Sequence, residues 1–84
     1  MYRIEYDVDI EKALRKIPKH DILAIRDRIK ELSKDPRAPG TIKLTGREAY
    51  RARVGIYRII YEIRDKELVI IVINVDNRAT VYKK

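Results

Sequence analysis

Apolar and polar residues alternate strictly at the start of the chain. Tyr2, Ile4 and Tyr6 are separated by charged residues. Side chains in a strand point to opposite sides in turn, so this alternation predicts a half-buried strand over residues 2–6. We expect its three apolar side chains to face the core.

The spacing of apolar residues then changes to that of helices. Apolar residues recur at i, i+3, i+4 and i+7 from Ile10, which predicts a short amphipathic helix over residues 10–17 with Asp9 as its N-cap. A second apolar stripe predicts a helix over residues 19–34, which Pro36 terminates. The two segments are expected to form an antiparallel helical hairpin.

Strand-like alternation returns in the second half of the chain. After a loop over residues 36–46, the pattern predicts strands over residues 49–54, 57–64 and 67–75. The first pair would be joined by a two-residue type II′ turn at Gly55-Ile56, and the second by a tight turn at Asp65-Lys66. These strands form a predicted β-meander.

One face of this meander is apolar throughout, and we expect the helices to cover it. Its members are Tyr50, Ala52, Val54, Tyr57, Ile59, Tyr61, Ile63, Leu68, Ile70 and Val72. The last strand is apolar on both sides, which is typical of an internal strand. The predicted fold class is therefore α+β: an antiparallel β-meander sheet with an N-terminal strand and a helical hairpin packed on one face, formed as one domain by residues 1–84.

The other face of the meander carries arginines. In the type II′ register Arg53 lies directly opposite Arg58, and such a like-charge pair costs roughly a few tenths to 1 kcal/mol, which suggests a use such as holding a polyanion. Running the last strand back places Asn74 opposite Tyr57, and the turn that follows it then brings Arg78 beside the pair. Arg58 would lie mid-sheet beside apolar Ile73.

A second interpretation of the arginines is structural. Arg51 and Arg53 would then only solvate an outer face and pair with Glu48 or Glu62. Guanidinium groups nevertheless remain charged at any working pH and bind phosphate oxygens with two parallel hydrogen bonds. Tyr82, four residues beyond Arg78, is close enough in the chain to enter the same site.

Charge and composition agree with a cationic binding surface. The formal net charge is +7, of which residues 1–42 contribute +2 (ten Lys/Arg, eight acids) and residues 43–84 contribute +5 (ten Lys/Arg, five acids). An excess of this kind is typical of proteins that bind nucleic acid or acidic partners. Charged residues make up 39% of the chain and Cys, Trp and Gln are absent, which fits a heat-adapted source.

Several kinds of chemistry find no support in the sequence. The acids are scattered without metal-ligand spacing, no glycine-rich phosphate loop is present, and His20 at the start of a charged helix is expected to be a surface or capping residue. No cofactor or metal is therefore expected. Without cysteine or an apolar leader, we expect a soluble cytoplasmic protein with no membrane partner.

The chain resembles toxins of the RelE/ParE superfamily, and within it the RelE mRNA endonucleases. The resemblance rests on the strand and helical hairpin, on Lys43-Leu-Thr-Gly46, on the stretch from Tyr50 to Tyr61, and on Arg78-Ala-Thr-Val-Tyr82. It implies a toxin of a type II toxin–antitoxin pair that a small antitoxin neutralises by wrapping its surface. For the RelE branch it implies cleavage of mRNA on the ribosome.

The resemblance also implies roles for individual residues. Arg58, Arg78 and Tyr82 fall on catalytic positions: Arg58 stabilises charge on the phosphoryl oxygens, Arg78 binds the phosphate or leaving group, and Tyr82 is the proton acceptor. Arg51, Arg53 and Lys43 are expected to bind RNA. The expected reaction is metal-independent attack of a 2′-hydroxyl on the adjacent phosphate.

Some residues depart from the family pattern. Relatives often have lysines where this chain has Arg51 and Arg53, and an arginine does not deprotonate to act as a base. Asp76 adds an acid before Arg78. Two alternatives stay open: a ParE-like, non-enzymatic toxin that inhibits DNA gyrase, and an inactive member that binds RNA or a partner without cleavage.

Overall fold

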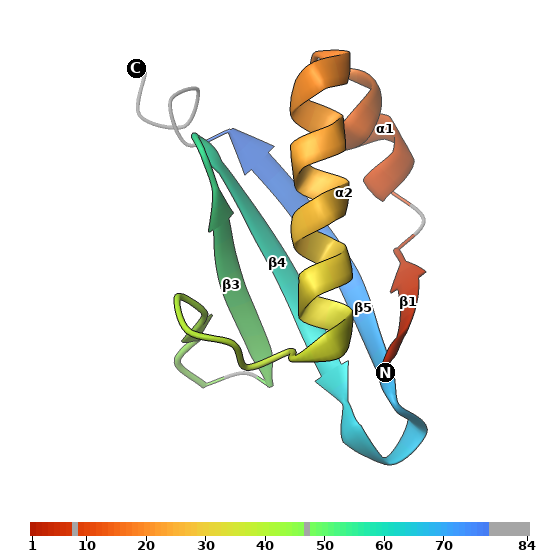
Figure 1. Cartoon of the computed structure of the whole chain (residues 1–84), viewed down its shortest axis with the longest axis vertical. Coiled ribbons are helices and arrows are strands. Elements are labelled where there is room, and N and C mark those ends of the chain that lie inside the picture. The colour runs from red at the N-terminus through yellow and green to blue at the C-terminus, as the bar shows by residue number, and fades with distance from the viewer. Residues whose placement is uncertain (8, 47, 78–84) are drawn as a thin grey trace.

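The computed structural model describes residues 1–7, 9–46 and 48–77, and it has five strands, two α-helices and one 3₁₀ turn in this part of the chain (Figure 1). In chain order they are β1 (Arg3–Tyr6), α1 (Ile10–Arg15), α2 (Lys19–Lys34), β2 (Ile42–Lys43), β3 (Ala49–Val54), β4 (Tyr57–Arg64), η1 (Asp65–Glu67) and β5 (Val69–Asn77).

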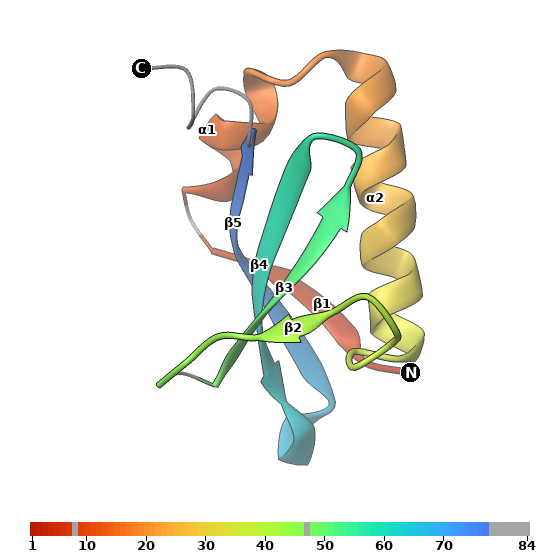
Figure 2. The same ribbon diagram turned by 90° about the vertical axis from the view of Figure 1, so that its left-hand side faces the viewer.

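The strands form one mixed sheet in the order β1-β5-β4-β3-β2. β1 pairs with β5 in parallel, and all other neighbours are antiparallel. β5 is thus an internal strand, as its two apolar sides predicted. The expected meander of β3, β4 and β5 is confirmed, and Figure 2 shows short β2 crossing beside β3 at the outer edge.

Both helices pack on the same face of the sheet, with α2 running along its length (Figure 1). The apolar stripe of α2 buries Ile25, Ile29 and Leu32 against the sheet, so the predicted helical face is confirmed. Tyr61 at the centre of β4 is fully buried. The predicted α+β class is therefore confirmed.

The helix α1 and the loop that follows α2 differ in detail from the sequence prediction. α1 ends at Arg15 rather than at residue 17, because the position before Pro18 is disfavoured in a helix. Asp9 occupies the N-cap position without a side-chain cap hydrogen bond. The predicted loop over residues 36–46 contains β2, whose two residues are both exposed and give no apolar pattern.

Tyr6 was expected in the core, but it is 45% exposed. Its register partner is the buried Val72, so it lies on the helix-facing side of the sheet. However, it ends an edge strand, where the apolar residues that line a hollow with it, Leu14 and Ile22, are only partly buried. Position at the edge, rather than orientation, leaves its ring in solvent.

The β3–β4 hairpin has the predicted register. Val54 pairs with Tyr57 and Arg53 pairs with Arg58 across the turn. A type II′ turn requires positive φ at its first central residue but not at its second. Gly55, the first, has φ +56°, and Ile56, the second, does not have positive φ. This hairpin fixes which arginines face each other.

The predicted β4–β5 register is wrong for two reasons. The connection is longer than the expected two-residue turn: η1 is followed by Leu68 in the left-handed region at φ 54°, and Arg64 pairs with Val69. Leu68, predicted to be in the core, is consequently exposed. Lengthening the turn by two residues shifts the register but keeps each later residue on its predicted face.

A β-bulge then adds a further shift of one residue. Tyr61 pairs with Val72 while Ile60 pairs with Asn74, so Ile73 is the extra residue in β5. Beyond this point the sides of β5 exchange. Asn74 therefore lies opposite Ile60 and not, as predicted, opposite Tyr57, whose partner is Asn77.

Candidate functional site: an arginine face with one carboxylate

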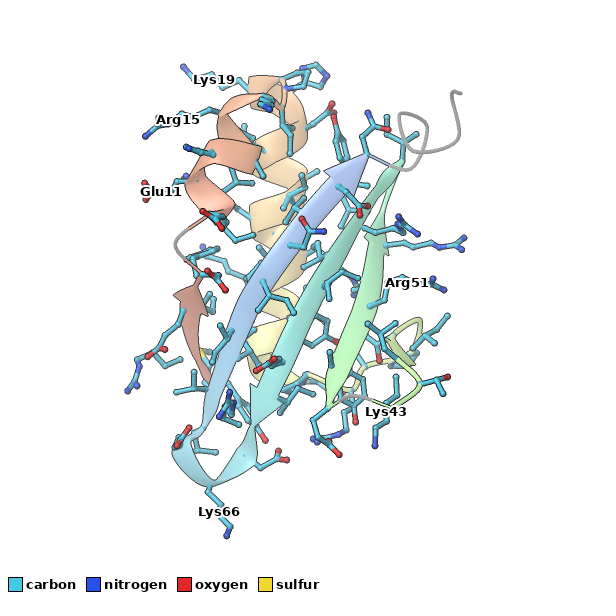
Figure 3. The ribbon with its side chains drawn as sticks, turned by 180° about the vertical axis from the view of Figure 1, so that it is seen from behind. Glu11, Arg15, Lys19, Lys43, Arg51 and Lys66 are labelled. Atoms are coloured by element: carbon cyan, nitrogen blue, oxygen red, sulfur yellow. The ribbon has the colours of Figure 1, made fainter. Side chains whose placement is uncertain are left out.

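Arg51 and Arg53 on β3 and Arg58 on β4 lie on the face of the sheet away from the helices, which Figure 3 shows from the open side. Alternation along β3 places the first two there, and hairpin pairing places Arg58 beside them. The predicted gathering of these three arginines on one face is confirmed. On the other side of the sheet, Ala52 between the two β3 arginines and Ile59 after Arg58 are fully buried in the core.

Arg58 is directly opposite Asp76 on its other flank and forms a two-pronged ion pair with it. Arg58 Nε donates to Asp76 Oδ1 at 2.9 Å, and Nη2 donates to Oδ2 at 3.2 Å. The expectation that Arg58 lies beside Ile73 is wrong, because the longer turn and the bulge shift β5 along β4. Asp76 belongs to the strand itself and not to a following turn.

Arg53 and Arg58 occupy opposed positions, so the repulsion between two cations is built into the hairpin. Arg53 is exposed, whereas the Arg58 side chain is only 20% exposed. The carboxylate of Asp76 partly neutralises the inner cation and leaves the outer one facing solvent.

Arg51 differs from its neighbours in having a buried polar atom without a partner. It lies opposite Ile60, and its Nε makes no hydrogen bond among the residues the structure describes. Such an atom costs roughly 1 to 3 kcal/mol. A bound anion that accepted this hydrogen bond would remove that cost.

Glu48 and Glu62 were the partners expected if Arg51 and Arg53 had a purely structural role, and the structure does not support this interpretation. Glu62 accepts from Arg64 at 2.9 Å, and Glu48 lies 3.5 Å from Lys43. Among the described ion pairs, neither glutamate contacts Arg51 or Arg53.

Lys43 lies apart from the arginines. It pairs with Tyr50, whose side chain belongs to the helix-facing side, and its ammonium group is held near Glu48. Figure 3 shows it beyond Arg51, towards the end of the sheet opposite the Gly55 turn. Arg78 and Tyr82, the two other predicted site residues, lie outside the described residues.

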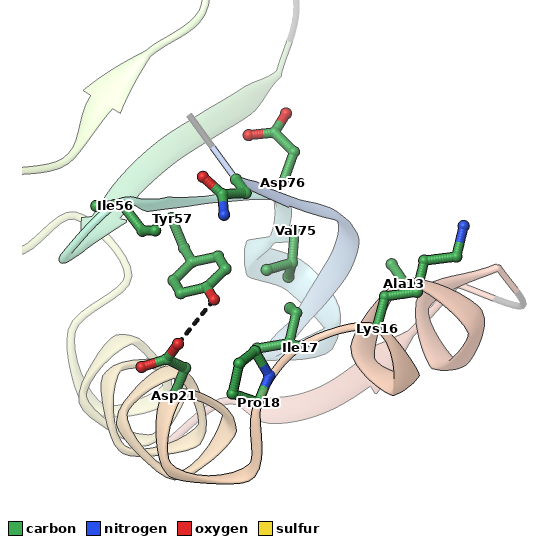
Figure 4. A pocket seen from close by; sticks show the side chains of 10 residues that line it. Ala13, Lys16, Ile17, Pro18, Asp21, Ile56, Tyr57, Val75 and Asp76 are labelled. Atoms are coloured by element: carbon green, nitrogen blue, oxygen red, sulfur yellow. Dashed lines mark hydrogen bonds between the residues drawn. The ribbon is translucent and has the colours of Figure 1, made fainter. Parts of the chain in front are cut away.

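A cavity of about 570 Å³ lies at the Gly55 end of the sheet, on the helix side (Figure 4). Tyr57 donates a hydrogen bond of 2.8 Å to Asp21 across it, which raises the pKa of the Tyr57 phenol. Val75 points into the cavity towards Ile17, whereas Asp76 points away from it. Val75 and Asp76 thus point to opposite sides of the sheet.

A second charged cluster, which sequence reasoning missed, lies at the far end of the sheet. Arg37 donates to both carboxylate oxygens of Asp65 at 3.1 and 2.9 Å, and Tyr2 donates to the same group at 2.7 Å. Arg37 also donates to the Tyr50 hydroxyl and stacks over its ring. Hydrogen bonds from Arg37 and Tyr2 lower the pKa of Asp65, and the cluster ties β1, the α2–β2 loop and η1 together.

The remaining sequence candidates are far from the arginine face. His20 is exposed and lies 3.3 Å from Asp21, in keeping with a surface role. In residues 1–7, 9–46 and 48–77, no group of three or more His, Cys, Asp or Glu side chains is arranged to hold a metal ion. No helix in this part of the chain is long and apolar enough to cross a membrane.

The arginine face has side chains of the kind that bind phosphate oxygens. Its guanidinium groups offer fixed N–H donors at any working pH, and its carboxylate can accept a proton. The sequence indicated the arginines through strand alternation. It did not indicate that Asp76 contacts Arg58, although the presence of an acid near Arg78 was the available signal.

Comparisons with known proteins give a consistent result. The family model described as the ParE toxin of type II toxin-antitoxin system, parDE, matches residues 2–82. Toxin RelG of Mycobacterium tuberculosis (strain ATCC 25618 / H37Rv) is 29% identical over 87 residues, which cover 99% of this chain and 98% of that protein.

Solved structures of other proteins have a similar fold. The archaeal RelE–RelB complex from Pyrococcus horikoshii OT3 has a chain 31% identical to this one, with a TM-score of 0.81 and coverage of 92% of this chain and 94% of that chain. The intact E. coli RelBE toxin–antitoxin complex has a chain 25% identical, with a TM-score of 0.81 and coverage of 92% and 96%.

Proposed function

The chain belongs to the ParE toxin family of type II toxin–antitoxin systems, within the RelE/ParE superfamily, and from its similarity to Toxin RelG and to a solved RelE chain we propose that it is a ribosome-dependent mRNA endonuclease of the RelE type. The reaction is attack of a 2′-hydroxyl on the adjacent phosphate, which gives a cyclic phosphate and a free 5′-hydroxyl. The observation that carries the proposal is the opposed pair Arg53 and Arg58 on the open face.

Different arginines bind the RNA and stabilise the charge that develops during cleavage. Arg58, fixed at the centre of the sheet, stabilises the charge that builds on the phosphoryl oxygens. Arg51 and Arg53 hold the RNA backbone on the open face. Arg78 binds the phosphate or leaving group, Tyr82 takes part in proton transfer, and Lys43 adds an outer RNA contact.

Two partners follow from the proposal. A small cognate antitoxin would neutralise the toxin, in keeping with the RelE relatives that were solved in complex with RelB. The ribosome would orient the message in the cytoplasm, because positioning the 2′-hydroxyl for attack is worth several orders of magnitude in rate to a site without strong bases.

Primer extension on a message translated in vitro tests the proposal. The wild-type protein should cut ribosome-bound message and leave free message intact. Arg58→Ala should slow cutting by roughly 10²- to 10³-fold, the usual loss when a donor to a developing oxyanion is removed. The matched control is Arg3→Ala on the edge strand β1, which removes the same side chain outside the site and should cut normally.

A second candidate is a ParE-like toxin that inhibits DNA gyrase without cutting RNA. The description of the matching family model favours it. Blocked supercoiling by purified gyrase, together with intact messages on ribosomes, would establish this alternative. Message cutting with unaffected supercoiling, abolished by Arg58→Ala and retained by Arg3→Ala, would exclude it.

A further inference from the structure

Asp76 is the one acid in the described part of β5, and it borders the arginine face beside Arg58. Its side chain is 29% exposed, so it is sheltered but open to a ligand. Glu62 shares this face, but it lies further along β4 and is held by Arg64. Asp76 is therefore the carboxylate nearest to the proposed phosphate site.

The ion pair with Arg58 fixes how this carboxylate is presented. Two guanidinium N–H groups each contact a different carboxylate oxygen, so the plane of the carboxylate is held against β4. An ionised carboxylate has about four lone-pair positions, and the pair occupies two of them. The others can accept a proton from a hydroxyl group that approaches from the open face.

The charged groups around Asp76 differ on the two sides of the sheet. On the open face it contacts Arg58, with Arg53 next to Arg58 on β3. Towards the helices, Lys16 of α1, Asp21 of α2 and Tyr57 line the cavity at the same end of β5. Figure 4 shows the Asp76 carboxylate directed away from that cavity, so its charged neighbours are the arginines.

We propose that Asp76 is the general base of the cleavage reaction, an inference that rests on the proposed endonuclease function. One Asp76 oxygen takes the proton of the 2′-hydroxyl while the O2′–phosphorus bond forms and the phosphorus–O5′ bond breaks. The departing 5′-oxygen receives a proton from solvent, and Asp76 later returns its proton to solvent. Arg58 bridges the base and the phosphate.

Basicity at neutral pH favours a carboxylate over a phenol in this role. Aspartate side chains are ionised at neutral pH, whereas a phenol with a reference pKa of about 10 is almost entirely protonated. Asp76 thus supplies the proton acceptor that the arginines cannot provide.

The test is single-turnover cutting of ribosome-bound message by Asp76→Asn, which keeps the shape of the side chain. We expect the rate to fall by roughly 10²- to 10⁴-fold, as general-base catalysis implies, and the acidic limb of the pH–rate profile to disappear. Binding to the ribosome–message complex should be unchanged or tighter, because one negative charge is lost. Asp27→Asn on the exposed side of α2 is the matched control and should cut normally.

A second variant separates chemistry from structure. Asp76→Ala should be inactive, and added formate, a small carboxylate that can enter the vacated space, should restore part of its activity. Because formate could also refill the ion pair with Arg58, rescue is compared with that by the more basic acetate: rates that rise with the basicity of the added carboxylate report proton transfer, which a merely structural ion pair would not show. Thermal unfolding of both variants checks that the sheet is intact.

The outcomes distinguish this inference from the function on which it rests. If the wild-type protein cuts no message, the endonuclease proposal fails and the role of Asp76 fails with it. If the wild-type protein and Asp76→Asn cut at the same rate, or if Asp76→Ala is inactive with and without formate, the role of Asp76 alone is overturned.

Discussion

Replacing Arg53 with threonine should stabilise the fold while it weakens the proposed RNA binding. Arg53 lies directly across the hairpin from Arg58, and it makes none of the described ion pairs. Threonine keeps a high strand propensity and removes the charge. The variant therefore isolates the repulsion between the two guanidinium groups.

The size of the effect follows from the geometry of the pair. Two unit charges about 6 Å apart in water repel each other by about 0.7 kcal/mol. Asp76 offsets part of this repulsion, since its carboxylate contacts Arg58 at 2.9 Å. We expect a gain of roughly 0.2 to 0.7 kcal/mol in the free energy of unfolding, or about 1 to 5 °C in Tm for a domain of this size.

Denaturant unfolding at low and high salt measures this gain. It should shrink as salt rises to about 1 M, where the screening length falls to about 3 Å, and it should grow in an Asp76→Asn background. Arg64→Thr is the control, because Arg64 on the same face is paired with Glu62 and its loss should not stabilise. A destabilised Arg53→Thr, or a gain that is independent of salt, would refute the reasoning.

Two further predictions concern hydrogen bonds that tie the loops to the sheet. Tyr61→Phe removes the 2.6 Å hydrogen bond to the buried Pro36 carbonyl and should cost about 1 to 3 kcal/mol in denaturant unfolding. In the wild-type protein burial raises the pKa of Tyr61 to about 12, so a late step in the phenol absorbance should be lost in the variant, and wild-type stability should fall between about pH 10 and 12. Unaltered stability of the phenylalanine variant would contradict this. Asp65→Asn should lower stability at neutral pH, because hydrogen bonds from Arg37 hold the pKa of Asp65 below its ordinary value of 3.8. Thermal unfolding at stepwise lower pH measures this loss of stability relative to the wild-type protein. The loss should vanish as the pH falls below 3.8. A loss that persists in acid would show that the charge of Asp65 is not its cause.

The sequence was sufficient to predict the parts of the structure that depend on residues close together in the chain. Gly55 determines the hairpin turn, and two-residue periodicity then determines that Arg53 meets Arg58, so this part of the site was predicted correctly. The helix-facing stripe of α2 is equally local, since it repeats with the helical period.

The β4–β5 pairing could not be predicted in the same way. Leu68 takes a left-handed conformation that nothing in a leucine favours, and the extra residue Ile73 has the same apolar character as its neighbours. The conformation of Leu68 and the position of the bulge both depend on how β5 packs between β1 and β4. The ion pair of Arg58 with Asp76 depends on this fit, so it was also missed.

The bulge at Ile73 makes the chemistry of the arginine face depend on the register of β5 as well as on residue identity. If the same residues paired without the bulge, Val75 would lie opposite Arg58 on the open side and Asp76 would turn towards the helices. Deleting Ile73 would instead keep Asp76 opposite Arg58, because Asn74 would then follow Val72 in plain alternation. A relative could therefore lose the extra residue and retain the carboxylate, whereas closing the bulge at constant chain length would leave a purely cationic surface.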